Sequence, residues 1–181
     1  MSKVFVMLAD GFEECEGLIV VDLLRRAGVD CITMSIKDSK EITSSHKVTL
    51  FADEALDEEL LKTGDMIVLP GGMPGTLNLE ASDAVQAAVR DYVAKDKYIA
   101  AICAAPTVFG HMGLLQGKKA CCYGGMEEGL VGAEVTYDKV TIDGKIITSR
   151  GLGTALDFGY ALIGILNSEA QAMEIKAKIM A

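Results

Sequence analysis

The stretch Ile99-Ala100-Ala101-Ile102-Cys103-Ala104-Ala105-Pro106-Thr107 decides the expected fold and contains the most reactive candidate side chain. Four apolar residues lead into a cysteine, which favours a short buried strand. Proline fits the first turn of a helix, because the N–H that it lacks would have no partner there. The run therefore predicts a strand that ends at Cys103 and turns directly into a helix.

Cys103 would lie at the corner of this turn, where a side chain points out of the carboxyl end of the sheet. The unpaired N–H groups of a helix start favour negative charge, so we expect this thiol to ionise more readily than a free cysteine. The alternative is an inert core residue, because free cysteine is among the most buried residue types. The corner, the small neighbours and Pro106 favour a nucleophile.

The rest of the chain alternates strands with helices. Apolar runs predict buried parallel strands at 3–8, 29–34 and 65–69, and helical spacing predicts helices at 13–27 and 82–95. Residues 35–50 are polar with short β-like pieces, and 53–63 contain a short helix. Further elements are a strand at 118–123, a loop at 124–132, a hairpin of 134–142 with 145–149 turning at Asp143-Gly144, and helices at 152–166 and 168–180.

This alternation predicts an α/β fold. We expect a flavodoxin-like three-layer α/β/α sandwich with a mostly parallel central sheet, formed by residues 1–181 as a single domain. Half of the residues are hydrophobic and the mean hydropathy is +0.31, which is enough to bury a core. We found no repeat, low-complexity tract or linker.

Composition argues against several classes of partner. The 17 basic and 26 acidic residues give a net charge of −9, whereas a general nucleic-acid surface needs clustered Lys and Arg. No apolar run approaches the ~20 residues that span a bilayer. The N-terminal residues pass directly into a strand pattern without a signal peptide, so we expect a cytoplasmic protein.

The five cysteines do not suggest disulfides or metal. Their number is odd, no C-x-x-C occurs, and the expected compartment is reducing. His46 and His111 lie far apart in sequence and near no cysteine pair, which argues against zinc. We therefore expect no metal and no cofactor.

Three expected strand ends carry unusual chemistry, and open α/β sheets bind ligands beyond the carboxyl ends of their strands. They are 11–16, Pro70-Gly71-Gly72 and Cys103. Glycines at 71–72 let the backbone present N–H groups, which together with the N–H of Ala104 could form an oxyanion hole. The alternative is a tight strand-to-helix turn with no further role.

Three glutamates open the first expected helix. The positive end of a helix explains at least two of them. Glu16 is the one that could face Cys103, where a neighbouring thiolate would favour its protonated form. It could then donate a hydrogen bond to the sulfur or move protons during a reaction. His111 lies eight residues beyond Cys103, roughly 12 Å along a helix, which is too far for a Cys–His dyad.

Taken together, these motifs resemble the ThiJ/PfpI superfamily of the class I glutamine amidotransferase-like fold, and within it the DJ-1 branch. The resemblance covers nearly the whole chain and is specific for the family more than for an activity. The matching pieces are Gly11–Glu16, Val21–Gly28, Leu69–Gly72, Ala100–Thr107 and Thr148–Thr154.

The resemblance implies roles for particular residues. Cys103 matches a reactive cysteine that oxidises to the sulfinic acid, and Glu16 matches a protonated glutamate hydrogen-bonded to it. The N–H groups of Gly72 and Ala104 would line an anion pocket. Members are usually homodimers, with the first helix at the interface. Their activities include cofactor-free glyoxalase, deglycase-like and chaperone activities and protection against oxidative stress.

Three positions depart from the family pattern. The protease branch has a histidine directly after the cysteine, where this chain has Ala104, so peptidase chemistry lacks its base. Several relatives have a histidine at the place of Tyr123, which leaves Glu16 as the evident acid/base. His46 stands where relatives of the branch have an arginine, so an anion contact there becomes pH-dependent or absent.

Two functions remain open from the sequence. The first is an enzyme in which Cys103 adds to the aldehyde of a small α-oxoaldehyde and Glu16 moves the proton. The second is a non-enzymatic redox sensor or chaperone, in which oxidation of Cys103 to the sulfinic acid changes a partner surface.

Overall fold

A six-stranded sheet forms the centre of the computed structural model, which describes residues 1–181. The strand order is β2-β1-β5-β6-β10-β9, and all neighbouring strands are parallel except β10 and β9. The strands are β1 (Lys3–Leu8), β2 (Asp30–Ser35), β5 (Met66–Leu69), β6 (Tyr98–Ile102), β9 (Val140–Asp143) and β10 (Ile146–Ser149). The expected mostly parallel sheet is confirmed.

The inner strands β1, β5 and β6 carry apolar side chains on both faces, because both faces of the sheet are covered there. Successive side chains of a strand point to opposite faces. In β1, Val4 and Val6 join one buried cluster, whereas Phe5 and Met7 join the other. Each of these inner strands therefore contributes to two cores, which is why no polar alternation marks it in the sequence.

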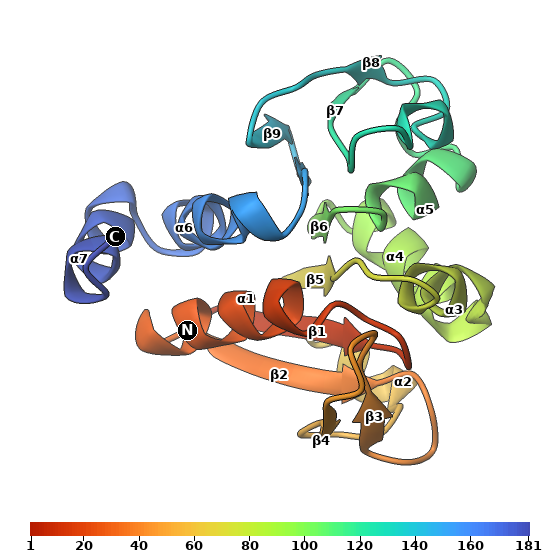
Figure 1. Cartoon of the computed structure of the whole chain (residues 1–181), viewed down its shortest axis with the longest axis horizontal. Helices are drawn as coiled ribbons and strands as arrows, with labels where there is room; N and C mark the ends of the chain where they lie inside the picture. The colour runs from red at the N-terminus through yellow and green to blue at the C-terminus, as the bar shows by residue number, and fades with distance from the viewer.

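Helices form the two outer layers. One side consists of α1 (Glu14–Arg26), α6 (Ala155–Leu166) and α7 (Glu169–Lys178), which pack against one another at the left of Figure 1. The other side holds α2 (Glu58–Leu61), α3 (Gly75–Ala81), α4 (Asp83–Ala94) and α5 (Pro106–His111). This arrangement confirms the three-layer α/β/α sandwich. None of the helices has the length and apolarity needed to traverse a membrane.

The structure adds one helix to the sequence-based prediction. α3 follows the glycine-rich turn directly and ends one residue before Ser82, which caps α4 by accepting the Val85 N–H. Its seven residues bury only Gly75, Thr76 and Leu79. So few buried positions leave no helical period in the sequence.

The expected strand at 118–123 is much shorter than predicted. Only Lys119–Ala120 is extended, as β7, and it pairs in parallel with β8 (Glu134–Val135) in a separate small sheet. The N–H of Cys121 donates to the Thr148 hydroxyl at 3.0 Å, so the chain leaves the strand ladder there. The hairpin that turns at Asp143-Gly144 is confirmed, but its first arm is β9 and not the whole of 134–142.

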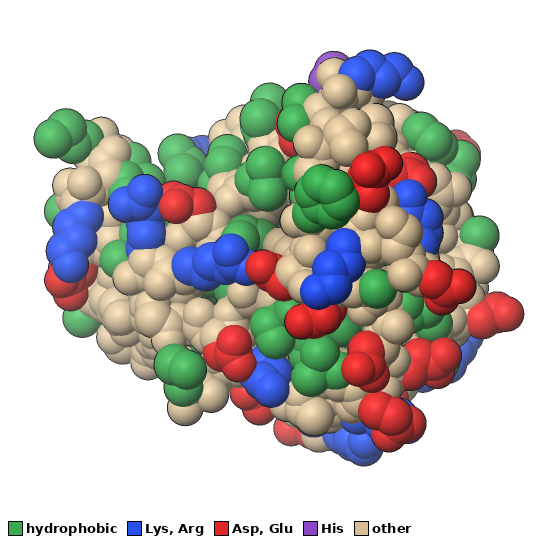
Figure 2. Space-filling view, turned by 90° about the horizontal axis from the view of Figure 1, so that it is seen from below, with side chains coloured by type: hydrophobic (Ala, Val, Ile, Leu, Met, Phe, Trp, Pro, Cys, Tyr) green, Lys and Arg blue, Asp and Glu red, His purple; other side chains and the backbone are tan.

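Two further small elements lie outside the central sheet. β3 (Glu41–Thr43) and β4 (Thr49–Phe51) form an antiparallel pair, as the β-like pieces of 35–50 suggested. A 3₁₀ turn, η1 (Glu127–Gly129), lies within the expected loop. On the face shown in Figure 2, acidic and basic side chains are interspersed. Charged side chains of the protein also pair locally, as Arg26 does with Asp22 at 2.6 Å.

Candidate functional site

Four neighbouring strands bring the site together at one edge of the sheet. In the order β1-β5-β6-β10, the segments that follow them contain Glu16, Gly71-Gly72, Cys103 and Gly151 respectively. The N–H of Cys103 donates to the Ser149 carbonyl at 3.0 Å, which joins the ends of β6 and β10. The three strand ends singled out from the sequence therefore meet, and β10 adds a fourth.

Cys103 occupies a strained corner directly after β6. Its φ of +66° lies in the left-handed region, which non-glycine residues rarely adopt. Both of its backbone groups are bonded, because its carbonyl accepts the Tyr123 N–H at 2.7 Å. Such strain persists only where the surroundings hold it, and it is concentrated at functional sites. The predicted corner is present, but α5 begins only at Pro106 and has six residues.

Glu16 lies beneath the cysteine in the first turn of α1 and is 2% exposed. Its carboxyl group shares a hydrogen bond with the Cys103 thiol and accepts the Gly71 N–H at 3.1 Å. Glu13 caps α1 by accepting the N–H of Glu16 at 2.6 Å, which fixes the start of the helix. The structure thus brings Glu16 and Cys103 into contact.

Burial dominates the acidity of Glu16. Removal from water raises the pKa of this carboxyl from its ordinary 4.5 to about 7. The hydrogen bond with Cys103 and the N–H of Gly71 lower the pKa, whereas the charge of Glu13 raises it. Glu16 can therefore hold or release a proton near neutral pH, as a general acid/base must.

The thiol behaves differently from the prediction. We expected a lowered pKa, but burial and then the negative charge of Glu16 raise the pKa of Cys103 to about 12. The N–H groups of Ala104 and Gly72 act in the opposite direction. The six-residue helix α5 begins three residues after Cys103, and its N-terminal N–H groups do not offset the effect of burial on the thiol pKa. Cys103 can thus ionise near neutral pH only when Glu16 takes up the proton and loses its own charge.

The turn at 71–72 requires glycine at both positions. A Cβ on Gly71 would lie 2.5 Å from the Cβ of Cys103 and 2.6 Å from Oε2 of Glu16. Gly72 has φ +93°, and its Cβ would collide with the backbone of Phe12 and Glu13. The tight turn is therefore real, and it also directs the Gly72 N–H at the sulfur.

An open hollow adjoins the cysteine, and we call it the Arg150 hollow. Its volume is about 280 Å³. A Cβ placed on Gly151 would lie 3.9 Å from Sγ of Cys103 and 3.7 Å from Oε1 of Glu16, so this part of the hollow wall lies next to the reactive pair. The residues that line it are Tyr123, Gly124, Arg150, Gly151, Leu152, Gly153 and Thr154.

The segment after β10 was not singled out from the sequence. Leu152 supplies an N–H that lowers the pKa of Glu16, and Gly151 leaves room above the sulfur. Thr154 holds the segment by accepting the N–H groups of Arg150 and Gly151 at 3.2 and 3.1 Å. The only feature of the sequence that could have indicated this segment as part of the site was its position directly after the strand predicted at 145–149.

Each of the two histidines contacts a carboxylate, and neither contact involves Cys103 or Glu16. His46 Nδ1 lies 3.0 Å from Glu14, and His111 Nδ1 lies 2.6 Å from Glu80. The ligand atoms of Glu13, Glu14 and His46 all lie within 4.8 Å of one another, a grouping that sequence spacing did not reveal. Because Glu13 already caps α1 and Glu14 contacts His46, helix capping and this side-chain contact account for the grouping.

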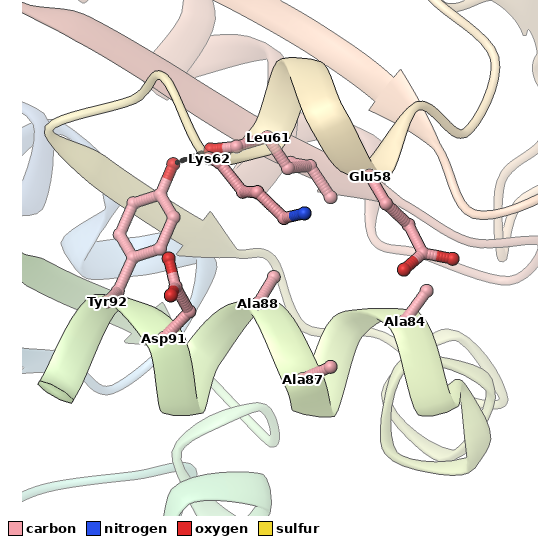
Figure 3. A pocket seen from close by; sticks show the side chains of 8 residues that line it. All are labelled: Glu58, Leu61, Lys62, Ala84, Ala87, Ala88, Asp91 and Tyr92. Atoms are coloured by element: carbon pink, nitrogen blue, oxygen red, sulfur yellow. Dashed lines mark hydrogen bonds between the residues drawn. The ribbon is translucent and has the colours of Figure 1, made fainter.

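Figure 3 shows a second cavity, of about 220 Å³, between α2 and α4. The cavity remains open because α4 presents the small side chains of Ala84, Ala87 and Ala88 to it. At one end, the Tyr92 hydroxyl donates to the Leu61 carbonyl at 2.7 Å. No cysteine or histidine lines it. The reactive chemistry therefore belongs to the edge of the sheet.

Known proteins are similar to this chain in sequence and in architecture. The model of the DJ-1/PfpI family matches residues 2–164. Protein DJ-1 homolog B of Arabidopsis thaliana is 36% identical over 181 residues, covering 99% of this chain but 41% of that protein, so this chain spans less than half of the plant protein. Glutathione-independent glyoxalase DJR-1.2 of Caenorhabditis elegans is 29% identical, covering 91% of this chain and 88% of that protein.

A solved structure shows the same fold. Oxidised DJ-1 of Toxoplasma gondii superposes with a TM-score of 0.94 at 35% identity, covering 99% of this chain and 98% of the other. Such agreement over the whole length confirms the layers and the strand order, and it matches the resemblance drawn from the five sequence motifs.

Proposed function

The chain belongs to the DJ-1/PfpI family, and from this premise we propose that it is a cysteine-dependent stress-response protein that converts α-oxoaldehydes into hydroxy acids without a cofactor. The substrate class is a small reactive carbonyl compound, and the chemistry is glyoxalase-like or deglycase-like. A relative named as a glutathione-independent glyoxalase supports this assignment. The observation that carries it is the hydrogen bond between buried Glu16 and the Cys103 thiol.

The first step forms a carbon–sulfur bond. The Cys103 thiolate attacks the aldehyde carbon, and the π pair of the C=O bond moves to oxygen. This oxygen takes the proton held by Glu16, which gives a hemithioacetal. The N–H groups of Gly72 and Ala104 stabilise the negative charge while it lies on oxygen.

The second step moves a proton between carbons. Glu16, now a carboxylate, removes the C–H proton of the hemithioacetal carbon and returns it to the neighbouring carbonyl carbon through an enediolate. The result is a thioester of Cys103. Water hydrolyses it, releasing the hydroxy acid and the thiolate, so the net reaction adds one water and involves no external oxidant or reductant.

The test is lactate formation from methylglyoxal without glutathione. We expect Cys103→Ser to abolish it, and Glu16→Gln to lower kcat by about 10²- to 10⁴-fold, because an amide cannot carry the proton. Exposed Cys15 offers a matched control, and Cys15→Ser should keep the wild-type rate. Equal rates for the wild type and Cys103→Ser would exclude this function.

A second candidate, a redox sensor, uses the same sulfur. Two peroxide molecules would each transfer one oxygen to Cys103 and leave as water, giving a sulfinate stabilised by Glu16 and the two N–H groups. The N–H groups directed at Sγ favour such an anion. Intact-mass measurement with peptide mapping after mild peroxide decides this. Two added oxygens on Cys31 or Cys121 with none on Cys103 would refute it.

We also propose that the protein forms a homodimer through α1, as the family resemblance implies. A hollow of about 370 Å³ on this helix is lined mostly by apolar side chains, among them Cys15, Leu18 and Ile19, with Leu156 of α6 beside them. Leu18 and Leu156 are 40% and 39% exposed. A second copy of the chain would bury them.

A further inference from the structure

The Arg150 hollow contains one charged side chain, and that side chain has no partner of opposite charge. Arg150 is in none of the ion pairs of the protein. Arg25 and Arg26, in contrast, pair with Asp53 and Asp22. A guanidinium without a carboxylate partner keeps its capacity to bind an anion.

Arg150 is nevertheless held in place. Its Nη1 donates to the Tyr137 carbonyl at 3.5 Å, and its Cζ lies 5.8 Å from the centroid of the Tyr137 ring. Its backbone N–H is fixed by the Thr154 hydroxyl. Nη2 makes no hydrogen bond with the protein, so this side of the guanidinium is free to donate.

The free side of Arg150 lies beside one glycine of the hollow, and the reactive sulfur lies beside another. A Cβ on Gly124 would lie 3.8 Å from Nη2 of Arg150, and a Cβ on Gly151 would lie 3.9 Å from Sγ of Cys103. Gly124 and Gly151 both line the hollow. The absence of a side chain at Gly124 and Gly151 therefore leaves room next to the cation and next to the nucleophile.

We propose that this hollow receives the non-reacting end of the substrate, and that Arg150 selects α-oxoaldehydes whose non-reacting end bears a carboxylate or a phosphate. This inference rests on the proposed function for the identity of the reaction. A guanidinium recognises both anions through paired N–H donors, so the chemistry is shared. Arg150 acts here as a specificity-determining residue, and it takes no part in the proton transfers.

The first test needs no turnover. Iodoacetate and iodoacetamide are close in size and differ in charge, and both alkylate a thiolate with loss of iodide. We measure the rate of Cys103 alkylation by each reagent and take the ratio of the carboxylate to the amide reagent. Arg150→Gln should lower this ratio by about two- to fivefold, and Arg150→Lys should lower it less.

Arg90→Gln is the matched control, because it removes the same charge from an exposed arginine of α4, and no residue of α4 lines the hollow. Its ratio should equal that of the wild type. An equal fall in Arg90→Gln and Arg150→Gln would mean that net charge alone attracts the reagent, and it would overturn the inference.

The second test compares methylglyoxal with its analogue that carries a phosphate ester on the methyl carbon. We expect a higher kcat/KM for the phosphate ester in the wild type, and Arg150→Gln should remove this preference while methylglyoxal stays within about twofold. A preference for the anionic compound that depends on Arg150 in either test supports an anionic substrate. The alkylation test reports on a carboxylate, and the turnover test reports on a phosphate.

The two proposals can fail separately. Without any turnover that depends on Cys103, the glyoxalase function is wrong, and the alkylation ratio still reports on the anion subsite. Ratios that do not depend on Arg150 in both tests overturn the subsite, whatever the turnover.

Discussion

At the scale of single residues, the site depends on where one proton lies between Cys103 and Glu16. With the thiol protonated, Glu16 loses its proton with a pKa of about 7. The pair can also lose its first proton from the sulfur instead of from Glu16. Because either group can release this proton, the apparent pKa of the pair for the first proton is no higher than about 7. At neutral pH and above, the pair therefore carries one negative charge, on oxygen or on sulfur.

Alkylation locates this charge. We expect the rate of Cys103 modification by iodoacetamide to rise with pH and to level off with an apparent pKa at or below about 7, because Glu16 takes the proton from the sulfur. Peptide mapping and Cys103→Ser identify the signal. A rate that rises only towards pH 12, where burial and a charged Glu16 place the thiol pKa, would put the charge on Glu16 and contradict the mechanism.

Gly71 offers a second test at this scale. Gly71→Ala would place a methyl group 2.5 Å from the Cβ of Cys103, so the corner must shift. We expect a loss of about 1–3 kcal/mol in the free energy of unfolding, together with slower Cys103 alkylation. Gly153→Ala is the control, because no atom lies within 4 Å of its added Cβ. Urea denaturation measures both, and an unchanged Gly71→Ala would show that the turn is looser than described.

Sequence reasoning identified Cys103 and Glu16, because a cysteine after a buried strand and a glutamate in a first helical turn are visible in the chain. It gave the wrong direction for the shift of the thiol pKa, which it expected to be lowered. That direction depends on burial and on how close a charged Glu16 comes, and both arise only when α1 packs against the ends of β5 and β6. The reactivity of the sulfur is thus a tertiary property.

At the scale of elements, the segment after β10 is organised by one hydroxyl. Thr154 Oγ1 accepts the N–H groups of Arg150 and Gly151 and lies 2.7 Å from the Ser149 hydroxyl. Thr154→Val removes this acceptor and leaves two N–H groups without their partner, and we expect a loss of about 1–3 kcal/mol. Thr154→Ser keeps the hydroxyl and should lose less than half as much. Thermal unfolding of the two variants compares them.

The long elements were predictable and the short ones were not. β1, β5 and β6 are apolar on both faces, and α1 and α4 repeat their buried residues with the helical period, so their limits were found within about two residues. α3 and β7 are too short to show a period. α3 follows the glycine-rich turn directly, and β7 ends where the Cys121 N–H donates to the Thr148 hydroxyl, which lies 27 residues away in the chain.

At the scale of the whole molecule, the buried Glu16 should make stability depend on pH. Its pKa is about 7 in the folded chain and near 4.5 when exposed, so the folded state binds more protons between these values. Its contribution is therefore complete below pH 4.5 and is lost as pH rises towards 7. The loss amounts to about 3 kcal/mol.

Urea denaturation at pH 4.5 and pH 7 tests this, with Glu16→Gln as the comparison. Because an amide does not titrate, the difference in stability between Glu16→Gln and the wild type should shift in favour of the variant as pH rises. Carboxyls with lowered pKa values, such as Asp10 and Asp53, act at lower pH and cancel in the difference. A difference that stays constant between the two pH values would mean that Glu16 titrates normally.

The proposed dimer is tested at the same scale. Leu18 and Leu156 form an exposed apolar face where α1 meets α6, and covering it with a second copy would remove that apolar surface from water. Leu18→Glu would place a charge in this interface, which is costly without a partner, whereas in a free monomer the side chain would remain in water. We expect sedimentation velocity to show a dimer for the wild type and a monomer for Leu18→Glu, with unchanged helical content by circular dichroism. Leu77→Glu, a comparably exposed leucine on α3, should leave the dimer intact, and a wild type that sediments as a monomer at micromolar concentration would refute the interface.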